Sequence, residues 1–133
     1  MFASNQGTPT TRTARYVYPT LADGVTLQTA EGDWVLGGMT EIIPKDTIDR
    51  DFTITAIVIE KVNRPNKTHE LILYAGEDKT EVARRRFVVN ESTGIERVDI
   101  DVRTLPADTP VFGRMAIQGP GAKYAVISLQ YEA

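Results

Sequence analysis

Three consecutive arginines, Arg84, Arg85 and Arg86, are the most unusual charged feature of the sequence. Guanidinium groups bind carboxylates and phosphates through paired hydrogen bonds, so such a run can bind an acidic surface. In an extended strand the run divides, with Arg84 and Arg86 on one face and Arg85 on the other. Because Arg85 then shares a face with Ala83 and Phe87, we expect it to extend to solvent or to pair with a carboxylate of a neighbouring strand. Arg84 and Arg86 could instead meet an acidic surface on another subunit or protein.

The residues available for acid–base or nucleophilic chemistry are few. The chain has one histidine, His69, and no cysteine, which excludes thiolate nucleophiles, cysteine-based metal sites and any site built on two imidazoles. His69 begins a predicted strand without a nucleophile-elbow motif around any serine, so we expect a solvated or hydrogen-bonded residue rather than a catalyst. Asp99 and Asp101 share one face of a strand, but Arg97 and Arg103 flank them there, as in a solvated charge ladder.

A second acidic cluster contains Asp46, Asp49 and Asp51, with Lys45 and Arg50 among them. Calcium takes about 6 to 8 oxygen ligands, and the cluster lacks the spacing of an EF-hand loop. Neither acidic cluster therefore predicts a metal site. We expect no catalytic residue, no metal, no cofactor and no enzymatic activity.

Trp34 lies between glycines, at Gly32 and at residues 37–38, where its ring could form a platform that stacks on a sugar. Tyr16 and Tyr18 share a face if their segment is extended. The alternative is packing in a core or an interface, where tryptophan and tyrosine both fit well.

The charge balance disfavours nucleic acid as a partner. The 133 residues include 15 Lys+Arg and 18 Asp+Glu, a formal charge of −3, and no wider basic field supports the arginine run. No apolar stretch has the length of a membrane span, and the N-terminus lacks the apolar region of a secretory signal, so we expect a soluble product made in the cytoplasm, with no membrane partner.

The chain length suits a single domain, which we place at residues 14–133 behind an extended arm at residues 1–13. The arm is polar and contains no acid, and Arg12 and Arg15 make this end of the chain locally positive. It is either a frayed terminus or a segment that becomes ordered against a partner.

From residue 14 onward the apolar residues alternate with period two, and turn residues separate the runs. The alternation predicts that Phe52, Ile54, Ala56 and Val58 share one face, and that Val98, Ile100 and Val102 face inward. Seven to nine short strands of this kind indicate an all-β antiparallel sandwich, jelly-roll-like, with about eight strands. The main candidate strands are 15–18, 25–29, 51–62, 69–75, 80–89, 96–103, 110–118 and 123–132. Residues 34–39 are a further candidate, interrupted by two glycines, and 41–43 is a short piece that ends at Pro44.

The order of segments from about residue 20 to the end resembles tailed-bacteriophage capsid cement (decoration) proteins of jelly-roll type. The resemblance is carried by DGV at 23–25, WVLGG at 34–38, EIIP at 41–44, DFTI at 51–54, LYAG at 73–76, EVARRRF at 81–87 and GPGAKYAVISLQY at 119–131.

The resemblance implies a structural virion protein that binds the capsid surface as a homotrimer, with the major capsid protein as its partner. Each subunit would bridge neighbouring capsid subunits and stabilise the lattice. Contacts would then come from the arm and the arginine run, at Phe2, Arg12, Arg15, Arg84 and Arg86. The alternative is a sandwich module on a tail or fibre that binds a carbohydrate or receptor through Trp34, Tyr16 and Tyr18.

Overall fold

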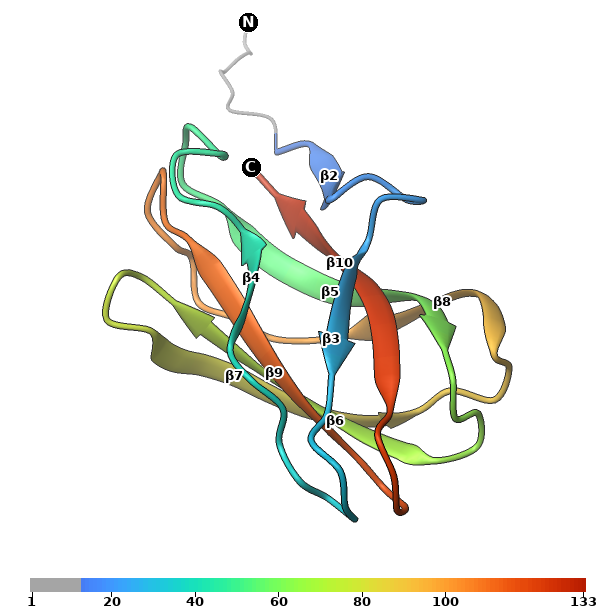
Figure 1. Cartoon of the computed structure of the whole chain (residues 1–133). Coiled ribbons are helices and arrows are strands. Elements are labelled where there is room, and N and C mark those ends of the chain that lie inside the picture. The colour runs from blue at the N-terminus through green and yellow to red at the C-terminus, as the bar shows by residue number, and fades with distance from the viewer. Residues whose placement is uncertain (1–12) are drawn as a thin grey trace, which may run out of the picture.

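The computed structural model describes residues 13–133, which form two antiparallel β-sheets with no helix between them. The first sheet contains β2 (Arg15–Tyr18), β3 (Val25–Gln28), β5 (Thr53–Val62), β8 (Thr93–Asp99) and β10 (Tyr124–Glu132). The second contains β4 (Thr40–Ile43), β6 (Thr68–Ala75), β7 (Thr80–Val88) and β9 (Val111–Ile117). Figure 1 shows the two layers, which enclose one core. The predicted all-β sandwich is confirmed.

The strand order is that of a jelly roll. Hydrogen bonding runs β2–β10–β5–β8 in the first sheet and β4–β9–β6–β7 in the second. β3 pairs with residues 124–127 of β10, and β2 pairs with residues 129–132 of the same strand. β2 and β3 therefore act as one strand that the loop at residues 19–24 interrupts. Counted in this way the sandwich has the eight strands of a jelly roll.

One predicted face of β5 is interrupted by a β-bulge. Ile54 lies in the core as predicted, but the prediction is wrong for Ala56 and Val58, which are buried outside the core cluster, while Ile57 lies within it. In the register with β10, Thr55 has no partner, so the alternation of side chains shifts by one residue at that point. The bulge explains why Ile57, and not Ala56, continues the core face that begins at Ile54.

The alternation around β8 holds beyond the end of the strand. β8 ends at Asp99, yet Ile100 and Val102 lie in the core and Val98 packs against it, as predicted.

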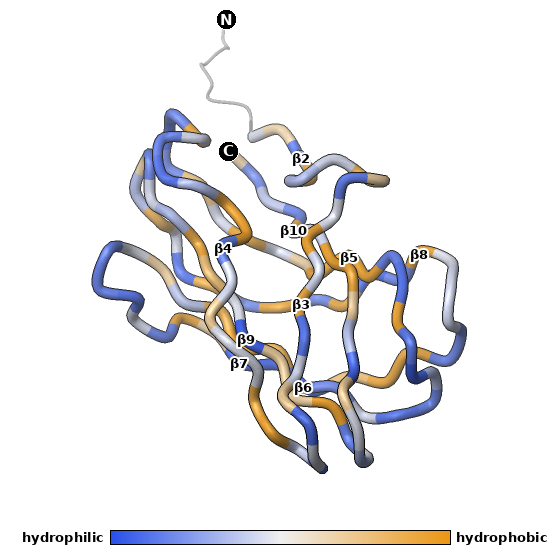
Figure 2. Tube along the Cα trace, in the orientation of Figure 1, coloured by the Kyte–Doolittle hydropathy of each residue, from blue (hydrophilic) through white to orange (hydrophobic). Residues whose placement is uncertain are grey.

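Figure 2 shows the hydrophilic residues concentrated in the turns that connect the strands. Within residues 13–133 there is no helix of the length and apolarity needed to cross a membrane.

Residues 34–39 do not form the predicted strand. Trp34 has a φ of 62°, in the left-handed region that breaks an extended strand. The backbone N–H of Trp34 donates to the carbonyl of Ile117 at 3.4 Å, and that of Gly37 donates to Met115 at 3.0 Å. The segment therefore runs beside β9 and leads into β4 without forming a regular ladder.

Candidate functional site

β6 and β7 place a row of charged side chains on the outer face of the second sheet. In their antiparallel register Glu70 pairs with Arg86, and Arg84 lies two residues before Arg86 on the same face of β7. Arg85 pairs with Leu71, which is a core residue. The arginine run therefore divides between the two faces of β7, as the sequence pattern predicts.

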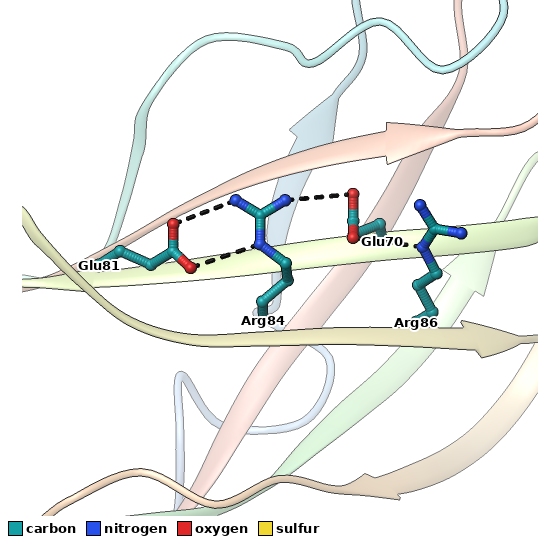
Figure 3. A network of polar contacts seen from close by, with 4 residues as sticks. All are labelled: Glu70, Glu81, Arg84 and Arg86. Atoms are coloured by element: carbon teal, nitrogen blue, oxygen red, sulfur yellow. Dashed lines mark hydrogen bonds and ion pairs between the residues drawn. The ribbon is translucent and has the colours of Figure 1, made fainter.

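Two arginines share one carboxylate in this row, as Figure 3 shows. Arg84 donates from Nε and Nη2 to the two oxygens of Glu81, at 3.3 and 3.1 Å, and its Nη1 lies 3.5 Å from Oε1 of Glu70. Arg86 donates from Nε to Oε2 of Glu70 at 3.3 Å. The Glu70 side chain is 12% exposed, whereas Arg84 and Arg86 are 49% and 64% exposed. The hydrogen bonds to Glu81 raise the pKa of Arg84, which keeps it charged.

Trp34 adds an aromatic ring to this face. The guanidinium carbon of Arg86 lies 4.8 Å from the centroid of the indole ring, within the range of a cation–π contact. Trp34 is half-buried, and its left-handed backbone is uncommon for a bulky residue. Such a conformation persists only where the surrounding contacts hold it.

Two side chains hold the loop that precedes the indole. Asp33 accepts a hydrogen bond from the backbone N–H of Gly119 through Oδ1, at 2.7 Å. Lys123 is buried, and its Nζ donates to the carbonyl oxygens of Gly32 at 3.0 Å, Gly121 at 2.6 Å, and Gly119. The turn between β9 and β10 is thus fastened to residues 32–33.

Gly37 holds the loop on the other side of the indole. Its carbonyl oxygen accepts a hydrogen bond from Nε of Arg114 at 2.8 Å, and its N–H bonds to β9. Its α-carbon also lies so close to β3 that an added β-carbon would overlap the carbonyl of Gln28. The segment that carries Trp34 is therefore fixed between the edges of both sheets.

Arg85 lies in a cleft between the edges of the two sheets, where β7 of one lies near β8 of the other. The cleft has a volume of about 320 Å³, and Arg85 is exposed there, as expected for an arginine that extends to solvent. No ion pair of Arg85 forms within residues 13–133. The cleft is lined by Arg84, Arg85, Asp99, Ile100 and Asp101.

His69 lies in the core with its side chain fully buried. Its ring stacks on Phe87 with centroids 5.4 Å apart, and Nδ1 lies 2.8 Å from the carbonyl oxygen of Lys67. Nε2 has no hydrogen-bond partner. Burial lowers the pKa of His69 despite the hydrogen bond to the Lys67 carbonyl, so the imidazole is neutral near pH 7. Of the two alternatives expected for this histidine, the hydrogen-bonded one is observed, and the ring cannot reach a substrate at the surface.

Tyr16 and Tyr18 lie on β2, in the other sheet from the one that Trp34 borders. The ring of Tyr16 stacks on Tyr131 with centroids 5.3 Å apart, and Tyr131 meets Phe52 edge-on at 5.7 Å. Tyr18 packs against the core. Burial raises the pKa of Tyr131. The structure therefore does not bring together the three residues considered for sugar stacking.

Arg15 begins β2 and lies 3.6 Å from Oε2 of Glu132, with both side chains exposed. Ala14 and Ala133 exchange backbone hydrogen bonds at 2.9 and 3.0 Å, so the start of β2 is held beside the end of the chain. Two other residues expected to contact a partner, Phe2 and Arg12, lie outside the described residues.

The acidic residues of the loop between β4 and β5 serve local contacts. Asp49 lies 3.6 Å from Arg50, and Asp51 accepts a hydrogen bond from the backbone N–H of Ala107 at 3.1 Å. Across residues 13–133 no group of three or more histidine, cysteine, aspartate or glutamate residues is arranged to hold a metal ion.

The sequence did not predict the roles of Glu70 and Glu81, which pair with the arginines, or of Lys123, which holds the loop before Trp34. A signal for Lys123 was present, because the inward alternation of Ala125, Ile127 and Leu129 extends back to it. Glu70 comes next to Arg86 only through the pairing of β6 with β7, which no local pattern reveals.

No family model and no curated protein matches the sequence. Among solved structures, the chain is similar to the infectious bursal disease virus VP2 subviral particle, with a TM-score of 0.47 and 16% identity over 91% of this chain. It is similar to the same virus's T13 particle with a TM-score of 0.47 and 12% identity over 92% of this chain. This chain spans about a third of the length of those neighbours, 32% and 31%.

Proposed function

We propose that this chain is a structural virion protein, a trimer that binds the outside of a tailed-phage capsid and stabilises the lattice of major capsid protein. The observation that carries the proposal is the strand order, a complete eight-stranded jelly roll, which is an architecture used by viral capsid proteins. A fold alone does not assign a function. The proposed function therefore also has to be supported by the surfaces of the described residues.

The outer face of the second sheet supports a role in contact rather than in catalysis. Its most prominent groups are an indole and two exposed guanidiniums, residue types that are enriched where proteins bind one another. The one histidine of the chain is buried. In this proposal Arg84 and Arg86 belong to the surface that meets capsid or a second subunit.

The start of β2 supports the proposed role of the arm, residues 1–13. Ala14 is fixed beside Ala133 at the end of β10, so the arm joins the sandwich at a defined place. An extended segment with Phe2 and Arg12 could clamp a partner, for example by pairing with an exposed strand edge. Arg15, exposed at the start of β2, could contact the same partner beside the arm. Binding only the mature lattice would stabilise that lattice by mass action.

The proposal is tested by mixing the purified chain with mature and with unexpanded capsids and sedimenting the particles. We expect binding to mature capsids, and light scattering should give three times the 14.7 kDa mass of the chain. Deletion of residues 1–13 should abolish capsid binding while circular dichroism still reports a folded β-protein. A monomer that binds neither kind of capsid would contradict the proposal.

The second candidate function is carbohydrate or receptor binding on a tail or fibre through Trp34. Arg86 already covers part of the indole, so a sugar would have to stack on the remaining surface. A glycan array separates the two functions. Glycan binding that is lost in Trp34→Ala favours the carbohydrate-binding function. Capsid binding that is unchanged in the same variant shows that Trp34 does not contact the capsid.

A further inference from the structure

We infer that Arg86 is the arginine with which this face binds a carboxylate from an aspartate or glutamate of a partner protein, and that Arg84 has a structural role. The inference rests on the proposed function only in taking a protein as the partner. The difference between the two arginines follows from the atoms that each one uses.

Arg84 is already occupied by carboxylates of its own chain. Its Nε and Nη2 donate to Glu81, and its Nη1 lies near Glu70. Arg86 uses only Nε, toward Glu70, among the contacts that the described residues make. Both terminal nitrogens of Arg86 thus keep their N–H donors, and a guanidinium in this state can still bind a second carboxylate through two parallel hydrogen bonds.

Arg86 is also held in place before a partner arrives. Glu70 accepts a hydrogen bond from Nε of Arg86, and the centroid of the Trp34 indole lies 4.8 Å from the guanidinium carbon. The indole is in turn held by the loop contacts of Asp33 and Gly37. A preorganised side chain loses less conformational entropy on binding, which raises affinity.

The charges around Arg86 favour a single protein carboxylate over a nucleic acid. Glu70 and Glu81 balance the charges of Arg84 and Arg86 on this face, so its described residues offer no wider basic field to bind a continuous phosphate backbone, whereas one carboxylate needs only the unused donors of Arg86. Val88 lies two residues beyond Arg86 on the same face and is 48% exposed. Val88 and Trp34 together offer apolar surface beside the guanidinium, which a protein segment could contact.

The arm of the chain cannot supply this carboxylate, because the first acidic residue of the sequence is Asp23. The carboxylate must come from another surface, and the acidic side chain of a binding partner fits the vacant donors of Arg86. The exposed fraction of the Arg86 side chain, 64%, leaves room for it.

Nuclear magnetic resonance tests the inference on the full chain without any capsid. Trp34 is the only tryptophan, so its indole N–H gives one resonance that reports on the site. The probe is a blocked five-residue peptide with two glutamates, and its matched control carries two glutamines instead. We expect a saturable shift with the glutamate peptide and none with the glutamine peptide.

The variants separate the two arginines. Arg86→Lys keeps the charge but loses the planar fork, and affinity for the glutamate peptide should fall by about tenfold or more, the size of a charge-assisted hydrogen bond. Arg84→Ala removes an arginine whose contacts are ion pairs within its own chain, so it should change that affinity by less than about threefold. The inference is overturned if Arg84→Ala weakens binding as much as Arg86→Lys does, or if the glutamine peptide binds equally well.

Two further measurements identify other ligands. Tighter binding of inorganic phosphate or of an oligonucleotide than of the glutamate peptide would overturn the choice of a protein partner. Because no capsid is present, peptide binding through Arg86 together with failure to bind capsids would refute the proposed function alone. Capsid binding that is unchanged in Arg86→Lys, with no peptide binding, would refute this inference alone.

Discussion

Gly37 and Gly38, which lie three and four residues after Trp34, provide a direct test of how the loop is held. A β-carbon at Gly37 would lie far inside 3.0 Å of the carbonyl oxygen of Gln28, and that neighbour is backbone that cannot rotate away. A β-carbon at Gly38 would have no atom within 4 Å. Neither glycine has a positive φ, so alanine is compatible with both backbones. Gly37→Ala and Gly38→Ala therefore differ only in the clash.

The cost of Gly37→Ala follows from the contacts that the clash would break. Relief requires β3 and the loop to separate, which pulls Gly37 away from its hydrogen bond to Met115 and from Nε of Arg114. Loss of one backbone hydrogen bond and of one bond from a charged donor costs roughly 2 to 4 kcal/mol in total. Gly38→Ala should change the free energy of unfolding by less than about 0.5 kcal/mol.

Urea denaturation followed by the fluorescence of Trp34 measures both variants on the same reporter. We expect a lower midpoint for Gly37→Ala, with a shift in the emission of the native state because the indole moves relative to Arg86. If Gly37→Ala and Gly38→Ala have the same stability, the loop is not packed against β3 in the way described, and the account of how Trp34 is positioned fails with it.

Three other perturbations test separate parts of the structure. Because burial lowers the pKa of His69, the unfolded chain takes up its proton first, so stability should fall below pH about 6.5, by at most about 1.4 kcal/mol per pH unit; urea melts between pH 5 and 7.5 should show this slope in the natural chain and not in His69→Leu. Lys123→Met leaves three carbonyl oxygens without their donor and should cost about 2 to 4 kcal/mol, with faster amide exchange in residues 29–38; unchanged stability would show that the buried ammonium contributes nothing net. Glu70→Gln should lower stability by only about 1 kcal/mol, since both of its arginines are largely exposed, and a loss above about 3 kcal/mol would mean that Glu70 supports the sheet itself.

The fold could be predicted from the sequence because each strand carries its own evidence. Alternation around Ile100 and Val102 marks the inward face, and turn residues mark the ends of strands. The bulge at Thr55 could not be predicted, because an extra residue in one strand is defined only against the register of its partner. The prediction of a strand at residues 34–39 was wrong for a related reason, because the left-handed backbone of Trp34 depends on tertiary contacts.

The faces on which the arginines lie could be predicted from the sequence, but their contacts with Glu70 and Trp34 could not. The division of the arginine run between two faces follows from period two alone. Arg84 pairs mainly with Glu81, three residues away on the same strand. The partner of Arg86 is Glu70, which is 16 residues from it in sequence and adjacent only through the β6–β7 register. The contact between Trp34 and Arg86 spans more than fifty residues and crosses the sheet, so no local pattern contains it.

The position of β7 decides how a partner can approach this side of the molecule. β7 is the last strand of its sheet, and such an edge can pair with a foreign strand. Its register with β6 shifts at Val82, and it carries three charged side chains in succession, both of which disfavour strand addition. A partner of the kind proposed would therefore meet the side chains on the outer face, where Arg86 and Trp34 lie in contact. Arginines that protect an edge against aggregation can in this way leave the adjacent face free for a specific contact.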